Sequence, residues 1–366
     1  MRLLYVDNMA AHYRKSIFCL MDSSFDVEFL FGEPRQGIRQ MDTDSLKGII
    51  KITSIRYLFF KTYWQSGIIK KLFGKFDRYL LIGETRALST WMFCVLARLC
   101  GKSKHVYLWS HGFYGKEKWG ERLLKKLFFR LPGGGIFLYG NYARDLMIRE
   151  GFSPNQLFVI HNSLDYERQL ELRNQMYYDS IYTDHYHNIS KNVIFIGRFT
   201  AVKQLDLLLK AQSLCKERGF IFNLTLIGDG QNCDSLKELC RRLCLDNYVW
   251  FYGSCYDEEE NARLIYNADL CVSPGNVGLT AMHSLVYGTP VLTHSDFSHQ
   301  MPEFEAIHEG ETGDFFMRGS VESLADKIMT WFVIHKDRSV VRQLCYNEID
   351  SFWTPKFQID ILKKNL

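Results

Sequence analysis

Short apolar runs alternate along the chain with longer segments of helical spacing, and the alternation begins a second time near the middle. The strand candidates are residues 3–7, 27–31, 79–83, 106–110, 136–139 and 158–161, followed by 193–197, 223–228, 248–252, 270–273 and 290–293. Strands that alternate with helices predict a parallel sheet covered on both faces. Because the series restarts at residue 193, the sequence predicts two doubly wound α/β domains.

The segment between the two series, residues 166–192, is polar and rich in Tyr, Asp and Asn. It lacks the sustained period that a buried element needs, so it is predicted to be a linker. The first domain is then residues 1–165 and the second is residues 193–349. A chain of 366 residues, 47% of them hydrophobic, exceeds what one core usually serves, which also favours two domains.

The net charge of +4 hides an asymmetry between the two halves. Residues 1–165 carry 25 Lys and Arg against 14 Asp and Glu, or +11, whereas residues 166–366 carry 20 against 27, or −7. Much of the positive charge lies in residues 56–78 and 116–130, where lysines alternate with aromatic and aliphatic residues. Such stretches suit an anionic membrane surface, and they suit equally well two amphipathic helices with solvated lysine faces.

The cysteines and the apolar segments indicate in which cellular compartment the protein is expected. Ten cysteines are scattered without the paired spacing of metal ligands, which predicts reduced thiols and no bound metal. Asp7 comes too soon for a signal peptide, which needs about 7–15 uninterrupted apolar residues. The most apolar stretch, residues 87–100, contains Arg98 and is shorter than the ~18 residues of a membrane span. We expect a cytoplasmic protein, associated with the inner face of the cell membrane through its basic stretches.

A turn with two glycines joins the strand candidate 270–273 to the helical segment that follows. Ligands of open α/β sheets bind beyond the carboxyl ends of the strands, and anions favour helix N-termini. Gly275, Asn276, Gly278 and the amide of Leu279 are therefore predicted to form a cradle for a diphosphate, although such turns also occur simply for tight packing.

Two other turns follow strand candidates at the same predicted edge of the second sheet. One carries Arg198 and Lys203, two cations that could neutralise a departing diphosphate without a metal. The other contains Gly228 and Gly230, which permit a sharp turn. Asp229 between them is a candidate donor contact, but we expect it to cap the following helix rather than to take part in catalysis.

Six short segments carry a family resemblance. They are GRFTAVK at residues 197–203, GDG at 228–230, YNADLCVSP at 266–274, GL at 278–279, YGTPV at 287–291 and VIHNSLD at 159–165. In order and approximate spacing they resemble the nucleotide-sugar glycosyltransferases of family 4, strongly over residues 158–335 and loosely over the first domain. That family has the GT-B fold, two Rossmann-like domains that face each other across a cleft.

The resemblance implies a donor sugar nucleotide held mainly by the second domain, with Gly197 among its contacts, and an acceptor held mainly by the first. It also implies a transfer that needs no metal and retains the anomeric configuration. As in relatives, the C-terminal helix from about residue 350 is expected to pack back on the first domain.

One departure from the family concerns two glutamates that it places eight residues apart around the helix start. Registered on Gly278 and Leu279, those positions hold Gly275 and His283. His283 could exchange one hydrogen bond with a ribose hydroxyl, or it could be a partly buried structural histidine. Asn276 is a candidate substitute for the first glutamate. The donor sugar and the retaining outcome therefore stay open.

The resemblance adds five further candidates. Glu303 lies in a segment similar to the proline-glutamate segment beside the family's donor. His111, just after a strand, looks like the family's cleft histidine, and its pKa is expected near the operating pH, as for a general base or a hydrogen-bonding partner of the sugar. Asn8, His12 and Arg14 stand where relatives have a glycine-rich acceptor loop, and their alternative role is to cap and solvate the first helix.

The sequence thus predicts a hexosyltransferase that uses a UDP- or GDP-sugar and extends a lipid-linked or surface polysaccharide, as in capsule or lipopolysaccharide synthesis. Arg198, Lys203 and His111 are the predicted catalytic residues, and no nucleic acid partner is expected. Two alternatives stay open. A sugar-nucleotide epimerase of the same fold would need carboxylates in the cleft, and a catalytically weak binding module is favoured by the missing glutamates.

Overall fold

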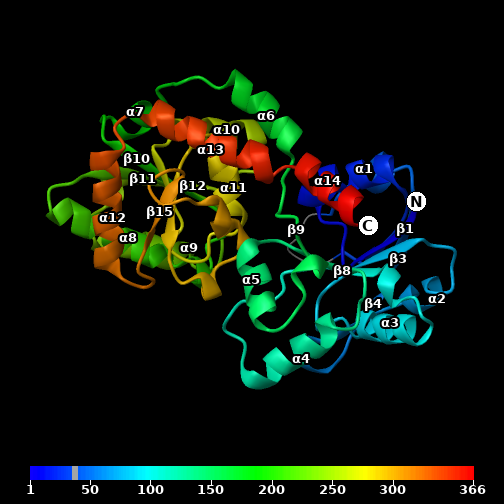
Figure 1. Ribbon diagram of the computed structural model, residues 1–366. Coiled ribbons are helices and arrows are strands. Elements are labelled where there is room, and N and C mark those ends of the chain that lie inside the picture. The colour runs from blue at the N-terminus through cyan, green and yellow to red at the C-terminus, as the bar shows by residue number, and fades with distance from the viewer. Residues whose placement is uncertain (35–39) are drawn as a thin grey trace. The chain divides into compact units, whose positions relative to one another are not determined.

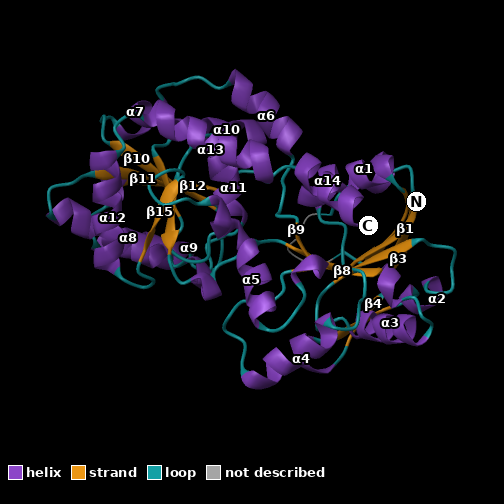
Figure 2. Ribbon diagram, in the orientation of Figure 1, coloured by secondary structure: helices purple, strands orange, loops and turns teal. Residues whose placement is uncertain are grey.

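The computed structural model describes residues 1–34 and 40–366. The chain divides into two compact units, one made of Met1–Tyr166 with Trp353–Leu366 and the other of Glu167–Phe352 (Figure 1). Each unit has a parallel sheet with helices on its faces (Figure 2). Among the described residues, no helix is long and apolar enough to cross a membrane.

The first unit contains a seven-stranded parallel sheet in the order β3-β2-β1-β6-β7-β8-β9. Its strands are β1 (Arg2–Asp7), β2 (Asp26–Gly32), β3 (Ile49–Thr53), β6 (Arg78–Ile82), β7 (Val106–Ser110), β8 (Gly135–Leu138) and β9 (Leu157–Val159). A separate antiparallel hairpin consists of β4 (Ile55–Tyr57) and β5 (Tyr63–Gln65). The strand order reverses between β1 and β6, which is where open α/β sheets bind ligands.

Alternate residues of β1 pack on opposite faces of this sheet, as the two-residue period of a strand requires. Leu4 and Val6 belong to one hydrophobic core, and Leu3 and Tyr5 belong to the other. The helices of the unit are α1 (Lys15–Ser24), α2 (Ile68–Lys71), α3 (Leu88–Leu99), α4 (Trp119–Phe129), α5 (Asn141–Arg149) and α14 (Pro355–Asn365).

The C-terminal helix α14 packs on α1 and so belongs to the first unit (Figure 1). Ile359 and Leu362 of α14 lie in the core that contains Tyr5. Gln358 fixes the helix to the chain after β9, because its Nε2 donates to His161 O (2.9 Å) and its Oε1 accepts from Ser163 Oγ (2.6 Å).

The second unit contains a six-stranded parallel sheet in the order β12-β11-β10-β13-β14-β15. Its strands are β10 (Lys191–Ile196), β11 (Phe222–Ile227), β12 (Val249–Gly253), β13 (Leu270–Val272), β14 (Val291–His294) and β15 (Gly313–Phe316). Its helices are α6 (Tyr166–Gln175), α7 (Ile181–Tyr186), α8 (Leu205–Glu217), α9 (Cys233–Arg242), α10 (Glu258–Asn267), α11 (Leu279–Val286), α12 (Val321–Ile334) and α13 (Arg338–Phe352). Here the strand order reverses between β10 and β13.

The prediction of an unstructured linker at residues 166–192 is wrong. This segment contains α6, α7 and the start of β10, and Tyr182 and Tyr186 of α7 are buried. The Tyr182 hydroxyl donates to Leu264 O (2.7 Å) and the Tyr186 hydroxyl donates to Leu224 O (2.8 Å). A buried tyrosine satisfies its polar tip in this way while its ring packs, so a segment that looks polar by composition can form part of a core.

Candidate active site

Three turns leave the carboxyl ends of β10, β11 and β13 and pack on one another; we call them the turn cluster (residues 197–203, 228–232 and 273–278). Hydrogen bonds join their backbones, from Phe199 N to Asp229 O (2.8 Å), from Asn232 N to Phe199 O (3.1 Å), from Gly275 N to Lys203 O (3.0 Å) and from Asn276 N to Val202 O (3.3 Å). The turn cluster lies at the reversal of strand order, where a ligand is expected.

Three glycines of the turn cluster are required by backbone packing. A Cβ built on Gly228 would lie 1.9 Å from Gly197 O, one on Gly230 would lie 2.5 Å from Phe199 O, and one on Gly275 would lie 1.9 Å from Val202 O. The missing Cβ of Gly275 therefore makes room for the neighbouring turn. The part of these glycines in donor binding stays a prediction.

Gly278 differs from these three glycines because a Cβ built there would make only ordinary van der Waals contacts. Its φ of 53° is in the left-handed region that favours glycine. The atoms nearest to a Cβ built there are Lys203 Nζ and the Met301 side chain, both 3.9 Å away. Gly278 is also the N-cap residue of α11, whose first amides have no acceptor within the helix. An anion at this point would meet an ammonium group and a helix N-terminus together.

Lys203 connects the first and third turns of the cluster. Its Nζ donates to Asn276 O (2.6 Å) and to Val277 O (3.2 Å). Burial lowers the pKa of Lys203 to about 8, with the charge of Glu303 opposing this shift and that of Arg198 adding to it. The ammonium group is therefore mostly protonated at pH 7. Since an ammonium has three donors, one N–H remains for a ligand.

Arg198 is exposed, and among the described residues it forms no hydrogen bond or ion pair. Its positive charge contributes to the lowered pKa of Lys203, which places the two cations near each other at the sheet edge. Two neighbouring like charges repel unless an anion lies between them. The arrangement therefore favours a ligand with at least one negative charge.

Gln300 holds the third turn in place. Its Oε1 accepts from Val277 N (2.8 Å), and its Nε2 donates to Thr293 Oγ1 (2.9 Å) and to His294 O (3.0 Å). Gln300 is buried, so these bonds are protected from water. Sequence analysis missed this positioning residue, because a glutamine gives no sign of its partners until the fold brings them together.

Two other donor candidates differ in burial, since Glu303 is buried and Asp229 is exposed. Glu303 is buried close enough to Lys203 for its charge to raise the pKa of that ammonium. Asp229 is exposed and its Oδ1 accepts from Gly230 N (2.7 Å). The prediction that Asp229 caps the next helix is wrong, because α9 begins at Cys233 after Asn232 and has no side-chain cap. The Asp229 carboxylate accepts a hydrogen bond within the turn, from Gly230 N, and not from the first amides of α9.

His283 lies in the last turn of α11, beside a carboxylate that sequence analysis did not find. Its Nδ1 is 3.9 Å from Glu258 Oε1, at the start of α10. The same oxygen accepts from the Tyr287 hydroxyl (2.7 Å) and from Gln169 Nε2 (2.8 Å). The side chains of His283 and Glu258 are 26% and 31% exposed, so both are accessible to a ligand.

The first unit has a cavity of about 660 Å³ at the carboxyl ends of β1, β6 and β7. Aromatic side chains form much of its wall, among them Tyr63, Trp109 and Tyr139, and the charged groups of Arg14 and Lys125 also line it. An aromatic wall with a few placed polar groups is typical of a small-molecule site.

Of the three predicted acceptor contacts, Arg14 lines this cavity, whereas Asn8 and His12 do not. Arg14 lines the cavity, pairs with Asp7 (2.6 Å) and lies over the Trp109 ring at 4.4 Å. Asn8 does not line the cavity, but its Nδ2 donates to Glu84 Oε1 (3.3 Å), which does. His12 is exposed and lies outside the lining.

His111 lines the same cavity, with its ring 4.5 Å from that of Tyr139. The expectation of a pKa near the operating pH is wrong. Burial disfavours the imidazolium, and the charges of Arg14 and Lys125 add to this effect, so the pKa of His111 falls to about 4. At pH 7 the imidazole is neutral, and its Nδ1 has no hydrogen-bond partner among the described residues.

Lys125 and Glu84 are cavity residues that sequence analysis missed. Lys125 was counted among solvated lysines, but its Nζ is buried and donates to Glu117 Oε1 (2.6 Å) and to Gly112 O (3.1 Å). Glu84 accepts from the Tyr63 hydroxyl (3.0 Å). It follows the strand end at β6, so the strand-end argument that selected His111 could also have found it.

Comparison with known proteins identifies part of the chain. Residues 187–343 match the family model of glycosyl transferases group 1. This match lies within the second unit and covers less than half of the chain. Over 177 residues, 47% of this chain and 44% of the relative, the sequence is 28% identical to an uncharacterized 41.2 kDa protein in the cps region of Klebsiella pneumoniae. Over 108 residues, 29% of this chain and 27% of the relative, it is 31% identical to the uncharacterized glycosyltransferase MJ1607 of Methanocaldococcus jannaschii. Both matches span less than half of the relative's own length.

Solved structures resemble the whole chain at low identity. HepE of Anabaena, solved in complex with UDP, is 14% identical with a TM-score of 0.71 over 100% of this chain and 99% of its own. The lipopolysaccharide outer core galactosyltransferase WaaB is 13% identical with a TM-score of 0.70 over 100% of both chains. The GT-B fold predicted from the sequence, with two Rossmann-like domains, is confirmed. Together the comparisons support the prediction of a glycosyltransferase.

Proposed function

We propose that this protein is a family 4 glycosyltransferase that moves a hexose-type sugar from a nucleoside-diphosphate sugar to a lipid-linked or surface polysaccharide acceptor. The observation that carries the proposal is the seat beside Gly278, where Lys203, Arg198 and the first turn of α11 can meet a diphosphate. HepE, which has a similar fold, was solved with UDP and with UDP-glucose, which favours a UDP-sugar over a GDP-sugar. The relative in the cps region favours a role in making capsule or a related surface polysaccharide.

In the proposed reaction, the bond between the sugar and the diphosphate breaks while an acceptor hydroxyl attacks the same face of the sugar, and the hydroxyl proton passes to an oxygen of the departing diphosphate. Negative charge grows on the departing diphosphate, and Arg198 and Lys203 neutralise it without a metal. Because these groups are already placed by the turn cluster, little reorganisation is needed when the charge develops. Asn276 and Glu303 are the proposed contacts of the donor sugar.

The ribose contact is proposed for His283 together with Glu258. A carboxylate can accept hydrogen bonds from two hydroxyl groups and a histidine from only one. Glu258 therefore supplies, beside His283, the carboxylate that is absent from position 283 of α11. The hydrogen bond from the Tyr287 hydroxyl holds the Glu258 carboxylate beside His283. In this proposal the pair takes the place of the glutamate missing at position 283, and Asn276 takes the place of the one missing at position 275.

The acceptor is proposed to bind in the cavity of the first unit, in contact with Arg14 and Glu84. His111 is neutral there, so it can exchange one hydrogen bond with a sugar hydroxyl without adding to the positive charges of Arg14 and Lys125. With a pKa of about 4 it is a poor base, so its proposed role is to position the acceptor.

Contact with an anionic membrane is proposed through α4. Trp119, Leu123 and Leu127 recur at four-residue intervals on this helix and are 81%, 44% and 53% exposed. The exposed lysines Lys116 and Lys118 precede the helix. An exposed apolar stripe beside cations is the pattern of a helix that lies in a membrane surface.

The nucleotide-sugar proposal is tested by adding UDP, GDP and ADP, and then their hexoses, to the protein. We expect UDP to raise the thermal unfolding temperature, because a ligand at about 100 times its Kd stabilises a protein by about 2.7 kcal/mol. A labelled UDP-hexose with a lipid-linked acceptor should then give a labelled glycan. An altered sugar without any acceptor would indicate an epimerase, and binding without any reaction would indicate a binding module. Failure of all three nucleotides to bind would contradict the proposal.

The membrane proposal is tested by vesicle flotation of a Trp119→Ser, Leu127→Ser double variant. We expect its partition onto vesicles with phosphatidylglycerol to fall at least about tenfold, since two large apolar side chains are lost from the interface. The control is Ile189→Ser, which removes a 95% exposed apolar side chain from the second unit. Equal partition of the double variant and the control would contradict a role for α4.

A further inference from the structure

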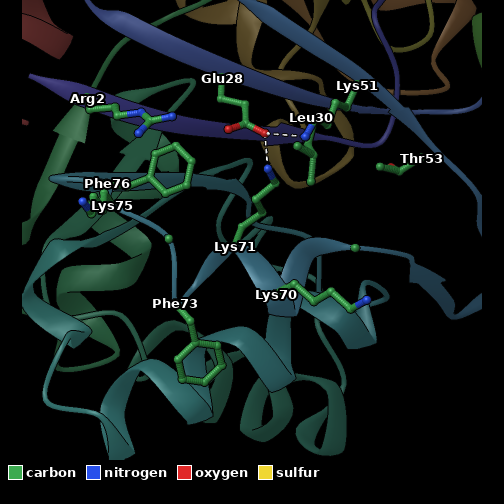
Figure 3. Close-up of a pocket in the computed structure, with 12 residues that line it drawn as sticks. Arg2, Glu28, Leu30, Lys51, Thr53, Lys70, Lys71, Phe73, Lys75 and Phe76 are labelled. Carbon is green, nitrogen blue, oxygen red and sulfur yellow. Dashed lines mark hydrogen bonds and ion pairs between the residues drawn. The ribbon is translucent and has the colours of Figure 1, made fainter.

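A second hollow in the first unit shares no lining residue with the cavity that contains His111. It has a volume of about 580 Å³ and is lined by residues of β1, β2 and β3 on one side, with α2 and the chain after it on the other. Figure 3 shows the side chains that line it. Five of them are cationic, namely Arg2, Lys51, Lys70, Lys71 and Lys75.

Among the described residues that line the hollow, Glu28 is the one carboxylate, and it is buried in the sheet. Lys71 forms an ion pair with it, and Lys51 Nζ is 3.5 Å away (Figure 3). A buried carboxylate is costly unless it is paired, so Glu28 holds these two lysines at the floor of the hollow. One negative charge cannot neutralise both of them.

The remaining cations increase this excess. Lys70 and Lys75 are exposed and form no ion pair with the described residues. Arg2 is 3.8 Å from Asp26 and also lies over the Phe76 ring at 5.0 Å. Even with Asp26 set against Arg2, the four lysines face one carboxylate, Glu28, which concentrates positive potential in one concave place.

The hollow is much larger than a single anion and has an apolar part. Leu30, Phe73 and Phe76 line it beside the lysines, and Phe73 is 69% exposed. Ligand sites typically have about 300–1,000 Å³ and combine apolar walls with a few charged groups. Ammonium groups suit the oxygens of a phosphate, and the apolar wall suits an organic group attached to it.

We propose that this hollow is a second ligand site, which attracts and binds the phosphate of an organic phosphomonoester or phosphodiester through the combined positive potential of Lys51, Lys70, Lys71 and Lys75. It is separate from the seat at Gly278, which belongs to the other unit, and it does not depend on the proposed transferase activity. The phosphate can come from a soluble compound or from a phospholipid headgroup, and the two sources require different probes.

The test uses a Lys70→Ala, Lys75→Ala double variant of the full chain. Neither lysine has an ion pair to lose, so the variant should fold and unfold like the parent protein. The matched control is Lys363→Ala, Lys364→Ala, which removes two exposed lysines from α14 in the same unit. The parent, both variants and the same set carrying Arg198→Ala are titrated with glycerol phosphate at low salt, so that binding at the donor seat is recognised. A parallel arm measures binding to vesicles with and without phosphatidylglycerol.

We expect the double variant to lose roughly tenfold in affinity for at least one probe, while the control keeps its affinity. A loss with glycerol phosphate supports a soluble phosphate ligand. A loss with phosphatidylglycerol vesicles alone supports a headgroup as the source. Equal affinities of the double variant and the control for both probes, or no binding of either probe by the parent protein, would overturn the proposal.

Discussion

The Arg198→Ala protein is expected to lose about a hundredfold or more of its transfer rate while it unfolds at the temperature of the parent protein. Arg198 has no partner among the described residues to lose, so removal of its side chain leaves the fold intact. The rate falls because one of two cations that oppose the growing charge on the diphosphate is absent. Initial rates with a labelled UDP-hexose, together with a thermal unfolding curve, measure the two effects separately.

The matched control for this variant is Arg242→Ala. Arg242 is also an exposed arginine of the second unit, at the end of α9. The control should keep both the transfer rate and the unfolding temperature. If Arg198→Ala and Arg242→Ala both kept the parent rate, the diphosphate seat would have to lie elsewhere. If both lost the rate to the same extent, the effect would reflect the general charge of the unit.

The second large effect is expected from Gly275→Ala. The added methyl group would lie 1.9 Å from Val202 O, and Val202 and Lys203 belong to the turn that must then move. Gly275 has no left-handed φ, so the cost is steric. We expect unfolding to become about 3 kcal/mol easier, the upper part of the usual range for overpacking, and UDP binding to be lost because Lys203 is displaced. Urea denaturation and the shift in unfolding temperature with UDP measure the two results.

The control for this substitution is Gly120→Ala in α4. A Cβ on Gly120 meets no atom within 4 Å, and alanine is the better helix former by about 1 kcal/mol. This variant should therefore be as stable as the parent protein or slightly more stable. Parent-like stability and UDP affinity in Gly275→Ala would show that the turns can separate, and that their contact does not position Lys203.

Much of the fold could be predicted because strands buried on both faces appear as continuous apolar runs. The runs at β1, β7 and β10 are of this kind, and each is a strand in the structure. β3 was missed, since its apolar Ile49 and Ile52 are more than half exposed and do not form a run. α7 was missed because two of its three buried side chains are tyrosines, whose hydroxyl groups find partners only in the folded chain.

The candidate site was predictable where a residue follows directly from a strand end. Arg198 and His111 were found in this way. Gln300 and Glu258 were not, because they reach the turn cluster and α11 from segments that the fold alone brings near. The low pKa of His111 could not be predicted either, since it depends on burial and on Lys125, which a linear sequence does not place beside it.

The position of α14 has a consequence for how the chain is made. Ile359 and Leu362 complete a core whose other buried members lie between Leu3 and Ile160. Domains usually fold in the order in which they leave the ribosome. Here the first unit needs α14, which is synthesised after all of the second unit, so the second unit can finish folding before the first.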